Sequence, residues 1–373
     1  MDNNDIIALL KKYSLGECTP DEEALVETWY INHRTGSLNF SIEELSADLE
    51  HINVQLLEHA KRRKARLWPK FVAAAAAIGL ILSIGTYFLN YKKLPDQQYA
   101  QIQKYDVGPG GNKAVLTLSN GKQIVLTEAR KGKLASENEI EIRKTADGKV
   151  VYSSDTEAKK INADLEYNTI TTPLGGQYKL VLSDGTNVVL DAASSIRYPV
   201  SFVGGERRVE ITGQVYFEVA HHKLKPFRVI AAGQTVEVLG THFNINAYND
   251  EPSIITTLLE GRVNVTKEGK SVILKPGQQS VVNGGALNVV EVNTDKAVAW
   301  KNGYFRFNDE KIESILRELS RWYGIKVIYK GKVPEEGFSG KISRYKNISQ
   351  VLKMLEYSGT VRFTLEERKV VVM

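Results

Sequence analysis

The sequence of 373 residues contains one cysteine, Cys18. No disulfide can therefore form within the chain, and its folded parts must be held together by burial of apolar side chains. Hydrophobic residues make up 42% of the sequence and charged residues 25%, which is ordinary for globular protein. This composition excludes wholesale disorder and a multi-span membrane protein, and the length allows two or three domains.

The sequence also lacks the motifs of common enzyme classes. No Gly-x-Ser-x-Gly nucleophile elbow is present, and the glycines at 108, 110 and 111 lack the Gly-Lys-Ser/Thr ending of a phosphate loop. His221 and His222 are adjacent, so in a strand they would point to opposite faces and make a poor chelating pair. We therefore predict that the protein is not an enzyme and has no catalytic residue, no metal site and no cofactor.

Charged side chains are absent from residues 71–91. About 20 apolar residues in a helix span the roughly 30 Å hydrocarbon layer of a membrane. We therefore predict a transmembrane helix at residues 69–91. Six basic side chains lie within residues 61–70, and only Lys92 and Lys93 follow closely. This bias predicts a single-pass inner-membrane protein with a cytoplasmic N-terminus and a periplasmic C-terminus.

The segment before this stretch carries apolar stripes at helical spacing. Thr19, Pro20 and Glu22 supply an N-cap, a proline at the first helical position and an early acid, and Ser41 begins a similar signature. Residues 1–60 hold twelve acidic and three basic side chains. We predict three short amphipathic helices whose small core gains from a basic partner protein. The alternative is that the acids only stabilise the helix N-termini.

Beyond residue 92 the apolar pattern changes to a period of two. Residues 116–126 (LTLSNGKQIVL) and 180–190 (LVLSDGTNVVL) each place Asn-Gly or Asp-Gly between alternating apolar runs, which predicts two hairpins. Gly-Gly precedes each copy of this internal repeat. Further short strands follow, including residues 208–211 and 215–219 on either side of Gly213. They predict an all-β domain and leave open whether it is a sandwich, a roll or a short solenoid.

After Trp300 strands and helices alternate. Residues 304–307 are predicted to form a strand, Asn308 to cap the following helix, and Gly324 to end that helix. A second strand and helix and a closing hairpin occupy the rest of the chain. Two strand-helix-strand units predict a C-terminal α+β module.

The β-rich region contains a long run of specific motifs. It reads GGQYKLVLSDGTNVVLDAASSIRYPVSF, then RRVEITGQVYFEVAHHKLKPFRVIAAGQTVEVLGTHFNINAY, then LLEGRVNV and LKPGQQSVV. Over about 110 residues it resembles the periplasmic domain of FecR-type transmembrane anti-sigma regulators. The C-terminal module resembles the short signalling module of secretins and TonB-dependent transducers. The matching positions in the run are Asp184, Gly185, Ser194, Tyr198, Pro199, Gly213, Tyr216, Phe217, Glu218, Val219, Pro226, Phe227, Gly240, Thr241, Phe243, Glu260, Gly261, Pro276 and Gly277.

The resemblance implies an anti-sigma factor that holds an extracytoplasmic-function (ECF) sigma factor at the inner membrane. Release would follow a signal from the signalling domain of an outer-membrane TonB-dependent transducer. Membrane proteases would be further partners, with no direct nucleic-acid binding. The predicted sigma-factor contacts are apolar side chains of the head: Ile6, Leu9, Leu10, Leu25, Trp29 and Tyr30. The alternative function is a membrane-anchored periplasmic protein that binds glycan or peptidoglycan.

These inferences define a multidomain fold class. It comprises a small all-α cytoplasmic head, one transmembrane helix, an all-β periplasmic domain and a C-terminal α+β module built as a βαβ repeat. The predicted boundaries are 1–68 for the sigma-binding head, 69–91 for the transmembrane helix, 92–168 for a β-rich leader segment, 169–290 for the FecR-like domain and 298–373 for the signalling module.

Overall fold

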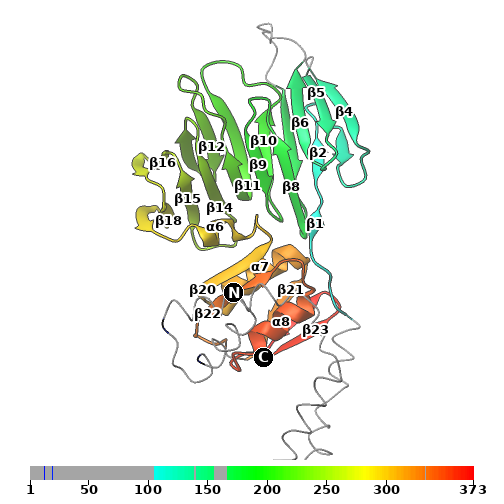
Figure 1. Cartoon of the computed structure of the whole chain (residues 1–373), viewed down its shortest axis with the longest axis vertical. Coiled ribbons are helices and arrows are strands. Elements are labelled where there is room, and N and C mark those ends of the chain that lie inside the picture. Colours follow the sequence, from blue (N-terminus) through cyan, green and yellow to red (C-terminus); the bar gives the residue numbers. More distant parts are fainter. Residues whose placement is uncertain (1–11, 13–18, 20–104, 138–139, 155–165, 332) are drawn as a thin grey trace, which may run out of the picture. The chain divides into compact units, whose positions relative to one another are not determined.

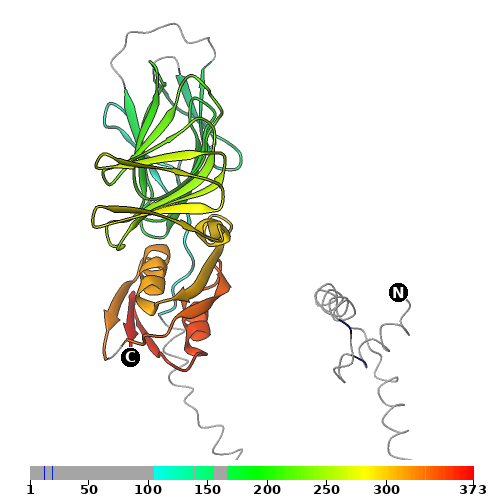
Figure 2. The ribbon, with the colours of Figure 1, turned by 90° about the vertical axis from the view of Figure 1, so that its left-hand side faces the viewer.

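The computed structural model describes residues 105–137, 140–154, 166–331 and 333–373, together with Lys12 and Thr19 (Figure 1). Contacts divide the chain into two compact units, Met1–Lys93 and Leu94–Met373. The description below concerns the second unit, which contains a β-domain followed by a C-terminal module. Its strands and helices are coloured from cyan to red in Figures 1 and 2.

The predicted fold class is wrong. Strands predominate among the described residues, and no helix there is long and apolar enough to cross a membrane. The helices that the structure describes are short because the alternating apolar pattern and frequent glycine turns favour strands from residue 111 onward. The residues predicted to form the all-α head and the transmembrane helix lie outside the described residues, apart from Lys12 and Thr19.

The β-domain consists of two sheets that enclose one apolar core. Sheet 1 contains, in spatial order, β3 (Gln123–Val125), β2 (Val115–Thr117), β7 (Tyr167–Thr171), β10 (Ser195–Pro199), the first half of β11 (Arg207–Glu218), β12 (Phe227–Ala231), β13 (Gln234–Val238), β16 (Val263–Lys267) and β17 (Lys270–Leu274). Sheet 2 contains β4 (Gly132–Glu137), β5 (Ile140–Lys144), β6 (Val150–Ser154), β8 (Gly176–Val181), β9 (Asn187–Leu190), the second half of β11, β14 (His242–Ala247), β15 (Ile254–Glu260), β18 (Gln278–Asn283) and β19 (Ala286–Glu291). The short strand β1 (Gly111–Asn112) pairs in parallel with β8.

Strand β11 belongs to both sheets. Its first half pairs with β10 and β12 in sheet 1, and its second half pairs with β9 and β14 in sheet 2. The change occurs at Gly213, whose φ of 75° lies in the left-handed region that favours glycine. Beyond this point Phe217 stacks on Phe243, with ring centroids 5.1 Å apart. The two sheets are thus joined covalently as well as through their core.

Both predicted hairpins are present. β2 and β3 are joined through Asn120-Gly121, and β8 and β9 through Asp184-Gly185, with Gly121 at φ 82° and Gly185 at φ 84°. The Asp184 carboxylate accepts hydrogen bonds from the backbone N–H and the hydroxyl of Thr186. Local turn chemistry therefore determines these two connections.

The C-terminal module has a core of its own. After the connecting helix α6 (Asp295–Ala299) it contains β20 (Tyr304–Glu310), α7 (Ile312–Tyr323), β21 (Lys326–Tyr329), β22 (Phe338–Ser343), α8 (Ile348–Glu356), β23 (Phe363–Glu366) and β24 (Lys369–Val372). β20 pairs with β22, and β24 lies between β21 and β23. Gly324 ends α7 as predicted, whereas the N-cap of α7 is Lys311 and not Asn308, because β20 extends to residue 310.

Residues 105–107, at the start of the described range 105–137, pack against this module and not against the β-domain. Tyr105 and Val107 pack against the core of the module. The Asp106 carboxylate accepts hydrogen bonds from the Ser349 backbone N–H and hydroxyl, at 3.1 and 2.8 Å, and from the Asn347 amide. A carboxylate at this end of α8 also complements the helix dipole.

Candidate functional site

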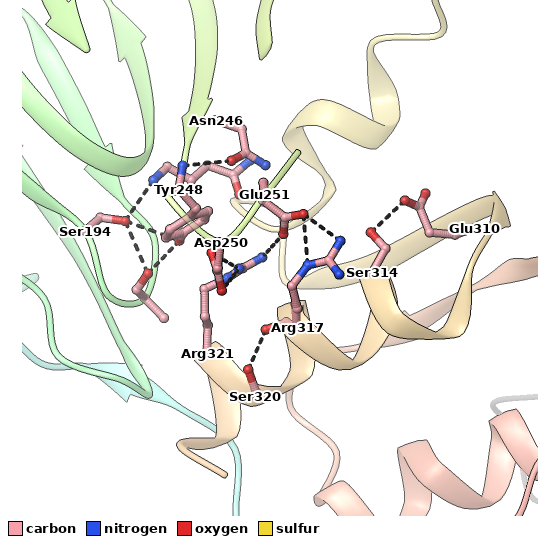
Figure 3. Close-up of polar contacts among 12 residues, drawn as sticks. Ser194, Asn246, Tyr248, Asp250, Glu251, Glu310, Ser314, Arg317, Ser320 and Arg321 are labelled. Carbon is pink, nitrogen blue, oxygen red and sulfur yellow. Dashed lines mark hydrogen bonds and ion pairs between the residues drawn. The ribbon is translucent and has the colours of Figure 1, made fainter. Parts of the chain in front are cut away.

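Charged residues gather where the β-domain meets the C-terminal module. Asp191, at the end of β9, and the pair Asp250 and Glu251, after β14, face arginines of the module. Figure 3 shows Asp250 and Glu251 beside these arginines of α7. Arg317 and Arg321 lie one turn apart on α7 and contact the same acidic loop. We call the set Asp191, Asp250, Glu251, Arg317, Arg321 and Arg344 the junction.

The most buried ion pair of the junction joins Arg344 and Asp191. Arg344 Nη2 lies 2.7 Å from Asp191 Oδ1, and the two residues are 1% and 4% exposed. Arg344 Nη1 donates to the Trp300 carbonyl at 3.1 Å, and the guanidinium stacks 3.8 Å from the centroid of the Trp322 ring. The pair therefore connects two segments 153 positions apart in the sequence.

The second part of the junction is a two-arginine cluster. Arg321 donates to both oxygens of Asp250 at 2.9 and 3.0 Å and to Glu251 at 2.6 Å. Arg317 donates to the other Glu251 oxygen at 2.9 and 3.1 Å. The Arg321 guanidinium also lies 4.0 Å from the centroid of the Tyr248 ring. Arginine suits such a site because its planar fork bonds carboxylates and stacks on aromatic rings at once.

Tyr248 links this cluster to the buried turn that carries Asp191. Its hydroxyl donates to the Ala192 carbonyl at 2.5 Å and lies 3.3 Å from the Ser194 hydroxyl (Figure 3). Burial raises the pKa of Tyr248, with the Asp191 charge acting in the same direction. Tyr248 therefore stays neutral and holds the turn at the end of β9.

The end of α7 packs against the two glycine pairs that precede the copies of the internal repeat, Gly110-Gly111 and Gly175-Gly176. The Gly175 backbone N–H donates to the Arg321 carbonyl at 2.8 Å. A Cβ on Gly110 would lie 2.8 Å from the Trp322 ring and 2.9 Å from the Gly175 carbonyl oxygen. Only glycine fits such a close approach. The two copies of the repeat thus meet at one place and support the module together.

Glu318 is a half-buried acid of α7 beside both ion-pair clusters. Burial raises its pKa to about 7; the charges of Arg344 and Arg321 oppose this change, whereas that of Asp191 adds to it. Glu318 is therefore partly protonated at neutral pH, which reduces the negative charge near Asp191.

We expect this acid to make the stability of the junction depend on pH. Because the folded pKa of about 7 exceeds the ordinary 4.5, the folded state binds the extra proton, and the free energy of unfolding falls as the pH rises between these values. In the original protein the free energy of unfolding should fall by up to about 3 kcal/mol over this pH range, and Glu318→Gln should abolish this fall. Urea unfolding of both proteins at pH 4.5 and 7.5 measures it.

Glu291, an exposed acid at the end of β19, supplies the control for this prediction. Glu291→Gln should leave the pH dependence of the unfolding free energy as it is in the original protein. Equal pH dependence in Glu318→Gln and the original protein would contradict the role of Glu318.

A cleft of about 1540 Å³ opens beside the junction. One wall is the outward face of sheet 2, and the other consists of α6, β20 and α7. Amide side chains line the sheet wall, and the indole N–H of Trp300 donates to Asn244 Oδ1 at 3.1 Å. The amides are Gln214, Asn244, Asn246 and Gln279. Such a wall offers hydrogen bonds to a polar ligand.

The candidate residues from the sequence fall in different places. Ile6, Leu9, Leu10, Leu25, Trp29 and Tyr30 lie outside the described residues. His221 and His222 are exposed, and within the described part of the chain no group of three His, Cys, Asp or Glu residues could hold a metal ion. Asp184 forms an ion pair with Arg207 at 2.8 Å. Its role is therefore structural.

Sequence reasoning missed the junction. The sequence singles out Asp191 only as a candidate carboxylate partner of Asp184, and nothing local identifies Arg344 as its ion-pair partner. Arg317 and Arg321 are spaced for one face of a helix, which was a usable signal. The acids that they meet follow β14 and are 66 to 71 positions away in the sequence.

Comparisons with known proteins agree with this architecture. Residues 168–264 match the family model described as FecR protein, and residues 304–372 match the model described as FecR, C-terminal. No curated protein matches. Two crystal structures of a candidate anti-sigma factor from Parabacteroides distasonis ATCC 8503, at 1.65 and 2.50 Å, are each 30% identical to the chain. Each alignment covers 55% of this chain and 98% of the solved one, with a TM-score of 0.52.

These matches include both described domains in the observed order. Anti-sigma factors act by binding a sigma factor, and their family is generally non-enzymatic. The family models and the solved relative together show that this chain belongs to the FecR family of anti-sigma factors.

Proposed function

We propose that this anti-sigma factor holds an ECF sigma factor and releases it on a signal from an outer-membrane TonB-dependent transducer. The C-terminal module would receive the signal, and membrane proteases would complete the release. Family membership supports the sigma-factor partner. The resemblance of the C-terminal module to the signalling module of such transducers supports the receptor.

The junction is the observation that carries the proposal. A receptor that binds the C-terminal module can affect the rest of the chain only if the module is coupled mechanically to its neighbour. The ion pair of Arg344 with Asp191 and the cluster around Arg321 provide this coupling. Separating the partners of a buried ion pair costs several kcal/mol of free energy. A force that displaces the module would therefore be transmitted to the β-domain.

The sigma-factor contacts at Ile6, Leu9, Leu10, Leu25, Trp29 and Tyr30 stay a prediction. The inner-membrane localisation, with the N-terminus in the cytoplasm and the C-terminus in the periplasm, also stays a prediction. The contact residues lie outside those that the structure describes, and the localisation awaits an experiment.

The proposed function is tested in the source cell with an epitope-tagged full-length chain. We expect a sigma factor to co-purify with it in stoichiometric amount. A chain that lacks residues 298–373 should still retain the sigma factor but should no longer respond to the imported substrate, as measured with a sigma-dependent reporter.

Two outcomes would contradict the proposal in different ways. If no sigma factor is retained by the full-length chain, the holding function fails, and the amide-lined cleft becomes the first place to test for a glycan ligand. If the shortened chain responds normally to the substrate, the module is not the receiver. An immunoblot for equal protein levels is the control for both measurements.

A further inference from the structure

Three loops of the β-domain expose apolar side chains next to one another. Leu224 is 89% exposed, Val203 57% and Leu239 44%. The loops that carry them follow β10, β11 and β13. They are adjacent because the His222 backbone N–H donates to the Leu239 carbonyl at 2.8 Å and the Lys225 ammonium donates to the Phe202 carbonyl at 2.5 Å. We call Val203, His221, His222, Lys223, Leu224, Lys225 and Leu239 the loop patch.

A buried arginine holds these loops in place. Arg207 is 2% exposed, and its Nε and Nη1 donate to the carbonyls of Lys225 and Ala220 at 2.9 and 2.7 Å. The same guanidinium donates to the Leu239 carbonyl at 3.4 Å and pairs with Asp184 at 2.8 Å. Leu224 is therefore presented by a braced loop, and its exposure is a property of the folded state.

The three loops carry more basic than acidic side chains, and the neighbouring Glu260 carboxylate lies 3.1 Å from His242 Nδ1. Lys223 and both histidines are exposed. The carboxylate of the first loop, Glu206, pairs with Arg228. Asp184, behind the patch, pairs with Arg207. The described residues of the three loops therefore present an excess of positive charge to solvent.

We propose that the loop patch binds the surface of an anionic phospholipid bilayer. The Leu224 side chain would enter the interfacial layer, and the Lys223 ammonium would contact lipid phosphates. Exposed apolar side chains flanked by cations suit such a surface, because burial and electrostatic attraction act together there. A fluid anionic surface needs no groove that fits a single projecting leucine, whereas a protein partner does. This inference goes beyond the proposed function and requires neither the sigma factor nor the receptor.

The test uses the full-length chain with Cys18→Ser and an environment-sensitive NBD fluorophore attached at Leu224→Cys. The labelled protein is mixed with vesicles of phosphatidylcholine alone or with about one third phosphatidylglycerol. We expect NBD emission to shift to the blue and to rise only with the anionic vesicles. Brominated lipids should quench it, and 0.5 M NaCl should reverse it, because salt screens the attraction.

Two variants make the result specific. The same fluorophore at Tyr357→Cys, on a residue 77% exposed at the end of α8, reports whether the whole molecule approaches the bilayer. It should remain in water. Lys223→Glu in the Leu224→Cys protein should raise the anionic lipid concentration needed for half of the emission change by about tenfold.

Each other outcome overturns the inference. Equal emission from the two labelled positions in all vesicles would show that the loop patch does not meet the bilayer preferentially. An equal response to neutral and anionic vesicles would remove the role of charge. A blue shift without vesicles that grows with protein concentration would identify a second copy of the chain as the partner.

Discussion

The Arg344→Ala variant is expected to unfold with a free energy about 3–5 kcal/mol below that of the original protein. The variant leaves the Asp191 carboxylate buried without its cation, and the stacking on Trp322 is lost. Urea-dependent pulse proteolysis of the full-length chain, followed with a C-terminal tag, measures the change. The receptor-dependent reporter should also lose its response.

A double variant separates the charge from the shape of the site. Arg344→Met with Asp191→Asn removes both charges and keeps much of the volume, so it should recover most of the lost stability. Its reporter response shows whether the ion pair itself or only the seated module is needed. An Arg344→Ala protein as stable as the original would disprove that the buried pair fixes the junction.

The Gly213→Ala variant is expected to show the second large effect, a loss of about 3–4 kcal/mol in the free energy of unfolding. The added Cβ would lie 2.4 Å from Ser194 Oγ and 2.9 Å from the Ala193 carbonyl oxygen, and φ is 75°. The bend of β11 cannot open to relieve this overlap because both halves are paired within sheets.

Gly121→Ala is the matched control for this prediction. Gly121 also has a positive φ, at 82°, but nothing lies within 4 Å of an added Cβ. Its loss should be only about 1 kcal/mol, from the backbone conformation alone. Similar losses in the two variants, measured by the same pulse proteolysis, would mean that the close contact at the bend contributes little.

The turn sequences made much of the β-domain predictable. Asn120-Gly121 and Asp184-Gly185 specify their hairpins locally, so both were predicted from the sequence. The glycine at 213 was read as a break between two strands. In the structure it bends one continuous strand from sheet 1 into sheet 2, because a positive φ redirects a chain without ending its pairing on both sides.

The candidate site could not be predicted from the sequence, because it is not specified locally. Its contacts join residues far apart in the sequence, such as Asp191 with Arg344, and a local pattern contains no information about such partners. The predicted N-cap of α7 was wrong for a similar reason, because strand pairing overrode a local signal. Asn308 is a good capping residue, but pairing of β20 with β22 extends the strand to Glu310 and displaces the start of the helix.

The attachment of Asp106 to α8 determines how a pull on the chain would be distributed. A force applied on the N-terminal side of Tyr105 would first load the hydrogen bonds from Ser349 and Asn347 to Asp106. The strands of the β-domain begin only at residue 111. The C-terminal module would therefore bear this tension before either sheet does. The C-terminal module, although last in the sequence, would thus be the first domain to unfold or detach under such a pull.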